Sequence, residues 1–441
     1  MSFDLVVRGA NVQVGVVDGL VAEVGPEVEG NAREAVDASG LLVLPGAVDA
    51  HVHLNDPGRA HWEGFATGTA ALAAGGTTTA IDMPLNAIPP TLDAASFAAK
   101  AEAERGVARM DVALWGGLVP GDVDRLDELA AEGVVGFKAF MSASGVEEFE
   151  AADDVTLLEG MARAARLGLP VAVHAESDAI TSRLAARAVA AGRVGVADYL
   201  ASRPVVAELE AIGRAILFAE ETGCALHVVH VSTGRGVALV AEARARGVNV
   251  SCETCPHYLV LDADDAARLG ATAKCAPPLR PAAVVEELWS HVLAGDVDLI
   301  ATDHSPSPPE LKDTGNDHFA AWGGIPGAQT LVSLLYSYGC VARGLPVDRL
   351  ALLTASWPAA RFGLASKGTL TPGADADLLL LDPDQDWTIT RDDLLDRHRL
   401  SPFVGLTLRG RVVRTILRGR TIALDGRVVG EPSGRVLRRA V

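Results

Sequence analysis

Two histidines, His51 and His53, stand two positions apart at the end of a buried apolar run. Side chains at positions i and i+2 of a strand point to the same face, so both imidazoles can reach one metal ion. Later apolar runs also end in residues that bind or assist metals: Lys138, His174, His230 and Asp303. This repeated pattern predicts a metal site at the carboxyl ends of successive buried strands.

The six residues fit a binuclear hydrolytic centre. We expect His51, His53 and Asp303 to surround one ion and His174 and His230 to surround the other. Neutral imidazoles and a carboxylate suit Zn²⁺, and they also suit Fe²⁺, Co²⁺ or Mn²⁺. The cofactor predicted from the sequence is therefore a pair of divalent cations.

Lys138 is the unusual member of this set. An ammonium between two dications is repelled, so burial and charge should lower its pKa below the ordinary value of about 10.4. A neutral amine can react with carbon dioxide, and the resulting carbamate is an anion able to bridge both metals. The alternative is a surface lysine with no part in the site.

Elements of two kinds alternate through the centre of the chain. Candidate strands lie near 46–51, 77–82, 111–117, 133–139, 170–175, 225–231, 248–253 and 297–303. Between them lie amphipathic segments rich in Ala, Glu and Arg, such as 94–105, 155–167, 204–222 and 236–246. About eight such units predict a (β/α)8 TIM barrel. A doubly wound sheet is the runner-up, but no glycine-rich phosphate loop follows any strand.

Short strands at both ends of the chain predict a second domain. The candidates are 3–8, 12–17, 20–24 and 41–44 near one end, and 376–381, 412–419 and 421–424 near the other. We expect residues 1–47 and 365–441 to form one small β-sandwich domain, and residues 48–364 to form the catalytic barrel.

Composition and net charge restrict the kinds of molecule that the chain can bind. The 441 residues are 49% hydrophobic, so the chain can bury a large core. The net charge of −19 repels nucleic acids and anionic membranes, which favours a small-molecule substrate. The sequence lacks a secretory signal and a run long enough to span a membrane, and its five cysteines fit reduced thiols. We therefore expect a cytoplasmic protein.

The whole chain resembles the amidohydrolase superfamily, specifically its cyclic-amide branch of dihydroorotases, hydantoinases and allantoinases. The motifs most similar to those of the allantoinases are residues 57–65, 82–86, 252–258, 303–306 and 321–325, and residues 367–377 resemble the family's return to the small domain. In that family the lysine matching Lys138 is carboxylated and bridges two metals, which agrees with the argument from charge. The resemblance also implies a homotetramer.

The resemblance implies a reaction as well. Two metals lower the pKa of a bridging water, and Asp303 accepts a proton as general base and returns it to the ring nitrogen as general acid. For the allantoinases this opens the hydantoin ring of allantoin to give allantoate, a step of purine catabolism. The alternatives are a D-hydantoinase or dihydropyrimidinase, a dihydroorotase, or a non-catalytic scaffold relative that has lost its ligands.

Three positions depart from related patterns. Dihydroorotases typically have an arginine where this chain has Asn55, and hydantoinases typically have a tyrosine, an oxyanion donor, where it has Ala143. Relatives often have Ser or Asn at the position of Ala276. The sequence therefore supports neither a carboxylate-binding site nor a tyrosine oxyanion donor.

Six residues are candidates for substrate binding. By resemblance, backbone groups near Ala276 and Gly323 would hold the ring amide. Four further side chains could contact the substrate or shape its pocket, although each also has a purely structural interpretation: Asn86, His257, Arg59 and Trp322.

Overall fold

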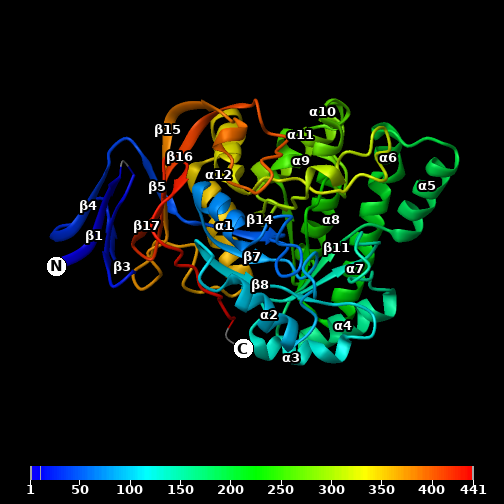
Figure 1. Ribbon diagram of the computed structural model, residues 1–441. Helices are drawn as coiled ribbons and strands as arrows, with labels where there is room; N and C mark the ends of the chain where they lie inside the picture. The colour runs from blue at the N-terminus through cyan, green and yellow to red at the C-terminus, as the bar shows by residue number, and fades with distance from the viewer. Residues whose placement is uncertain (1, 10, 440–441) are drawn as a thin grey trace.

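The barrel predicted from the sequence is confirmed by the computed structural model, which describes residues 2–9 and 11–439 (Figure 1). Its parallel strands are β6 (Ala47–Val52), β7 (Thr77–Asp82), β8 (Asp111–Leu114), β9 (Gly116–Gly117), β10 (Phe137–Phe140), β11 (Val171–His174), β12 (Leu226–Val228), β13 (Val250–Thr254) and β14 (Leu299–Ile300). Only Trp115 separates β8 from β9, so the two short strands together occupy one strand position of the barrel. The barrel closes where His304, beyond β14, pairs with Val52 of β6.

Helices follow the strands and cover the outside of the barrel (Figure 1). They are α1 (Phe65–Ala74), α2 (Ala94–Glu104), α3 (Leu126–Glu132), α4 (Asp154–Arg166), α5 (Asp178–Ala190), α6 (Val196–Ser202), α7 (Val205–Thr222), α8 (Gly234–Ala245), α9 (Pro256–Val260), α10 (Ala263–Leu269), α11 (Ala282–Ala294), α12 (Leu331–Leu335), α13 (Val347–Ala351) and α14 (Trp357–Arg361). Sequence signals fix several of their ends. Asp93 caps α2 by accepting the N–H of Ser96 at 2.8 Å, and Gly133 ends α3 in the left-handed region.

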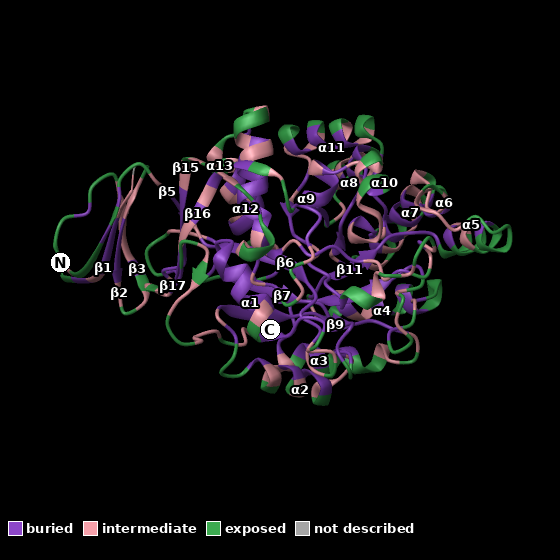
Figure 2. Ribbon diagram, turned by 45° about the horizontal axis from the view of Figure 1, so that its top comes forward, coloured by how far each residue is buried: buried purple, intermediate pink, exposed green. Residues whose placement is uncertain are grey.

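Alternation along the strands divides the apolar residues between two cores. Ala50, Ile81 and Ala113 belong to the cluster inside the barrel, while Ala80 and Val112 pack outward against the helices. In Figure 2 the buried residues gather in the strands, and the exposed ones lie on the outer surface of the helices. A strand buried on both faces explains why these segments read as continuous apolar runs.

The two ends of the chain supply two further sheets, seen beside the barrel in Figure 1. One contains β1 (Ser2–Gly9), β2 (Gln13–Val17), β3 (Leu20–Gly25) and β4 (Asn31–Ala38); the other contains β5 (Leu42–Pro45), β15 (Leu378–Thr388), β16 (Thr407–Leu417), β17 (Arg420–Leu424) and β18 (Arg427–Val428). Leu378 and Leu380 pack between the sheets, whereas Leu379 and Leu381 pack into the barrel's outer core. The second sheet therefore buries both of its faces.

The chain returns to the barrel after β18. Val436 pairs with Val112 of β8, and Arg435 donates its backbone N–H to Asp111 at 3.0 Å. Within residues 2–9 and 11–439, the helices are all too short or too polar to cross a membrane.

Candidate metal centre and substrate pocket

The strands deliver the predicted ligands to one end of the barrel. His51 lies on β6, Lys138 on β10 and His174 on β11, while His230 and Asp303 follow β12 and β14. His230 and Asp303 have φ values of 40° and 45°, in the left-handed region that residues other than glycine rarely adopt. Such strain persists where the surrounding structure imposes it, and it is concentrated at functional sites.

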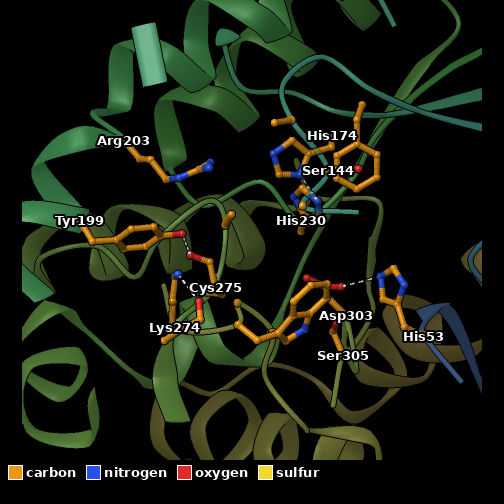
Figure 3. A pocket seen from close by; sticks show the side chains of 18 of the residues that line it. His53, Ser144, His174, Tyr199, Arg203, His230, Lys274, Cys275, Asp303 and Ser305 are labelled. Atoms are coloured by element: carbon orange, nitrogen blue, oxygen red, sulfur yellow. Dashed lines mark hydrogen bonds and ion pairs between the residues drawn. The ribbon is translucent and has the colours of Figure 1, made fainter. Parts of the chain in front are cut away.

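Asp303 meets the two histidines of the His-x-His motif. Its Oδ1 lies 3.3 Å from His51 Nε2 and 3.4 Å from His53 Nε2, and Figure 3 shows the contact with His53. Two ligands about 2.1 Å from one ion in tetrahedral geometry lie roughly 3.4 Å apart. These three atoms therefore have the spacing of ligands to a single metal ion.

His174 and His230 form a second pair of donors. His174 Nδ1 lies 3.1 Å from His230 Nε2, again close to the separation expected for two ligands of one ion. The ring centroids of His51 and His230 are 5.4 Å apart, so the two groups of donors are neighbours.

Lys138 has the environment that the sequence predicted for it. Its side chain is 0% exposed, and its Nζ has no hydrogen-bond partner among the described residues. Burial lowers the pKa of Lys138 to about 8. Burial also lowers the pKa of His51, His174 and His230, and the charge of Lys138 lowers each of these values further. A buried amine without a hydrogen-bond partner among the described residues, in a site where His230 Nδ1 also has none, fits a group that is modified or bound to metal.

Two buried carboxylates, which the sequence analysis missed, contact the ring nitrogens of these histidines. Glu253 lies 2.5 Å from His51 Nδ1 and 3.0 Å from His227 Nε2. Glu176 lies 2.9 Å from His174 Nε2 and accepts from Arg203. Carboxylates in this position fix the orientation of a ligating imidazole and raise its basicity.

The electrostatics keep these carboxylates ionised. Burial raises the pKa of Glu253, but the imidazoles of His51 and His227 outweigh burial and lower it to about 2. Burial also raises the pKa of Asp303, and the imidazoles of His51 and His53 lower it well below its ordinary value. The site therefore presents anions to whatever cation enters it.

His227 also supports the site, although it lies at an odd offset from His230. On a regular strand that offset would place the two side chains on opposite faces. However, β12 ends at Val228, and the left-handed backbone of His230 breaks the alternation. Because Glu253 contacts both His227 and His51, His227 supports the site from inside the barrel.

The candidate ligands open into a cavity of about 380 Å³ (Figure 3). Four of the six predicted substrate-binding residues line it: Asn86, Ala276, Trp322 and Gly323. The side-chain amide of Asn86 lies 3.5 Å from His53 Nδ1. Ala143 and Ser144 also line the cavity, at the position where hydantoinases typically place their tyrosine.

Arg59 and His257 lie outside the lining of the cavity. Arg59 donates to the carbonyl of Asn86 at 3.0 Å and to Glu148 at 3.0 Å, so it touches the pocket through the Asn86 loop. His257 is buried beside Tyr258, and burial lowers the pKa of His257 to about 4.

Backbone groups at one wall of the cavity are free to bind a ligand. Within the described chain, the main-chain N–H and carbonyl groups of Ala276 and Gly323 make no hydrogen bonds. Lys274 donates to Phe319 at 3.1 Å and to Ala321, and its own carbonyl accepts from Gly324 at 2.7 Å.

A second lysine holds the same loop. Lys312 donates to the carbonyls of Trp322 at 3.2 Å and Gly324 at 2.6 Å. Burial and the nearby Lys274 lower the pKa of Lys312 to about 7. Residues on both sides of Gly323 are therefore anchored while its backbone faces the cavity.

The parallel barrel and the donor atoms at its carboxyl end define a hydrolase of the metal-dependent kind, and sequence comparison agrees. A model of the amidohydrolase family matches residues 42–422, so the chain belongs to the amidohydrolase family. Its relatives include the allantoinase of Rubrobacter xylanophilus, 61% identical over 99% of this chain and 98% of that protein. The allantoinase of Solibacter usitatus is 52% identical over 99% and 97%. The resemblance to allantoinases is thereby confirmed.

Solved structures give the same fold. The L-hydantoinase (dihydropyrimidinase) of Arthrobacter aurescens has a TM-score of 0.94 and 35% identity, covering 99% of each chain. The dihydropyrimidinase of Brevibacillus agri has a TM-score of 0.90 and 32% identity, covering 100% of this chain and 98% of that one.

Proposed function

We propose that the protein is an enzyme that hydrolyses the hydantoin ring amide of allantoin to allantoate, a step of purine catabolism. The observation that carries this proposal is the set of donor atoms around the buried, unpartnered Lys138, in a chain that is 61% identical to an allantoinase.

The residues present fit a pair of divalent cations. His51, His53 and Asp303 would hold one, and His174 and His230 the other, with a carboxylated Lys138 between them. Imidazole and carboxylate donors at these separations suit Zn²⁺, and Fe²⁺, Co²⁺ or Mn²⁺ are compatible. When bound, the cations supply Lewis-acid polarisation of the ring carbonyl and lower the pKa of water.

Asp303 accepts and returns the proton that is transferred in the reaction. Its Oδ1 faces the two imidazoles, which leaves the second carboxylate oxygen for proton exchange. The ionised carboxylate accepts the proton of the attacking water as general base and returns it to the departing ring nitrogen as general acid.

Four residues of the lining orient the ring. The free backbone groups of Ala276 and Gly323 pair with the ring amide, and the side chains of Asn86 and Trp322 line the same cavity. Arg59 acts indirectly by fixing the Asn86 loop, and His257 is buried outside the lining of the cavity.

Asn55 argues against a dihydroorotase. It is buried, its Nδ2 donates to the carbonyl of Pro306 at 3.3 Å, and it brings no positive charge. A substrate carboxylate would lack the cation that dihydroorotases typically place here.

Product formation from four cyclic amides tests the proposal. Allantoin, hydantoin, dihydrouracil and dihydroorotate are each incubated with enzyme supplied with the same metal. We expect allantoin to be turned over far faster than the others. Faster turnover of hydantoin or dihydrouracil would overturn the assignment while leaving the metal chemistry in place, and finding no bound metal would favour a scaffold.

We further propose that residues 1–47 and 365–441 form one domain beside a catalytic domain of residues 48–364, and that the protein works in the cytoplasm as a homotetramer. Light scattering of the purified chain tests the assembly, since a tetramer has about four times the 45.7 kDa mass of one chain.

A further inference from the structure

Arg203 lies at the wall of the cavity away from the His53 and Asp303 pair. It follows the last residue of α6 and lines the cavity with Tyr199 and Lys274. In Figure 3 its guanidinium points from this wall toward His174. The cavity thus has a metal end at His53 and Asp303 and a second polar end at Arg203, which adjoins the candidate ligand His174 through Glu176.

The guanidinium of Arg203 has donors to spare. One nitrogen, Nη1, donates to Glu176, and within residues 2–9 and 11–439 the Nε and Nη2 groups have no acceptor. The side chain is 19% exposed and lines the cavity, and the guanidinium carbon lies 5.6 Å from the centre of the Tyr199 ring.

Neighbouring polar groups are already occupied. The Tyr199 hydroxyl donates to the main-chain carbonyl of Cys275 at 2.9 Å, and the Ser202 hydroxyl donates to the main-chain carbonyl of Tyr199 at 2.7 Å. Lys274 uses two of its three N–H groups on loop carbonyls. Among the described residues at this end, Arg203 therefore has the larger number of unused donors, and they lie in a fixed planar fork.

Charge selects the kind of acceptor. Glu176 already neutralises Arg203, so a second carboxylate would be repelled by Glu176, whereas a neutral carbonyl would not. Glu176 also fixes the guanidinium, which lowers the entropy lost when a ligand binds.

Allantoin carries the matching group. It is a hydantoin ring with a neutral ureido substituent, whose carbonyl oxygen has two lone pairs and can accept from two N–H groups. With the ring amide at the metal end, the substituent extends toward the second end. We infer that Arg203 binds the ureido oxygen and sets the preference for allantoin over hydantoins without an acceptor. This inference rests on the proposed function.

The test compares allantoin with 5-propylhydantoin, whose side chain has similar length but lacks an acceptor. Arg203→Met should lower kcat/KM for allantoin by one factor and raise the inhibition constant of 5-propylhydantoin by another. We expect the first factor to be roughly 10- to 100-fold larger than the second. Arg203→Lys keeps the charge beside Glu176 and should show the same selective loss to a smaller degree. Metal content is measured for every variant.

Glu253→Gln is the matched control. It disturbs the candidate ligand His51 without contacting Arg203, so it should weaken the turnover of allantoin and the binding of 5-propylhydantoin by equal factors. Equal factors for Arg203→Met as well would overturn the inference and leave Arg203 as a support for Glu176. If the wild-type enzyme does not hydrolyse allantoin, the proposed function fails first, and the inference falls with it.

Discussion

Replacing Lys138 by Met should have opposite effects on the metal-free and the metal-loaded protein. A pKa of about 8 instead of 10.5 corresponds to about 3 kcal/mol of unfavourable free energy for burying the ammonium. Methionine has a similar length and no charge. We therefore expect the metal-free variant to have a free energy of unfolding about 3 kcal/mol higher than the metal-free wild type at pH 7.

The pH dependence has a defined sign. Because the folded state lowers the pKa of Lys138, the penalty is complete below pH 8 and fades as the pH rises toward 10.5. The stability difference between variant and wild type should therefore shrink over that range. Urea unfolding in the presence of a chelator, extrapolated to zero denaturant, measures it.

The metal-loaded proteins should differ in the other direction. Without the lysine the proposed bridging carbamate cannot form, so bound metal and activity should fall, and short-chain carboxylic acids should restore part of both. Metal analysis and allantoate formation provide the assays. A variant that kept full metal content and activity without added acid would refute the bridging role, and an unchanged metal-free stability would refute the burial cost.

Three further predictions concern the support of the site. Glu253→Gln weakens the hold on His51, so we expect roughly 10- to 100-fold lower metal affinity in competition with a chelator, whereas the exposed Glu159→Gln should change nothing. Asp303→Asn removes the proton acceptor and should lower kcat by roughly 10²- to 10⁴-fold; a kcat within twofold of wild type would contradict its role. Lys312 has a pKa of about 7 in the folded state, so between pH 7 and 10.5 the unfolded chain binds its proton more tightly and stability rises with pH. Lys312→Met should remove up to about 1.4 kcal/mol of that rise per pH unit, and parallel stability profiles would contradict this.

The sequence was sufficient to locate the barrel because each central strand is buried on both faces. Runs such as Val171–His174 are therefore continuously apolar, and a polar residue at their end is conspicuous. Strand β4 was missed for the opposite reason. Half of its residues Asn31–Ala38 are polar and most of them are exposed, so its pairing with β1 leaves little trace in the apolar pattern.

The supporting residues could not be found from the sequence with the same ease. Glu176 stands two positions after His174, which is a weak local signal, but Glu253 and His51 are 202 positions apart and meet only through the closed barrel. The lysines that hold the loop around Gly323 satisfy main-chain carbonyls, which have no signature in the sequence.

The return of residues 434–439 to β8 bears on how the protein is made. Arg435 and Asp111 meet across 324 positions, and Thr415 reaches Ala73 across 342. A nascent chain emerges in order, so β8 is exposed long before the segment that pairs with it is synthesised. Contacts between residues so far apart in the sequence slow folding, and until they form the exposed edge of β8 can pair with a wrong partner. We therefore expect chaperone dependence to persist until residues 434–439 have left the ribosome and paired with β8.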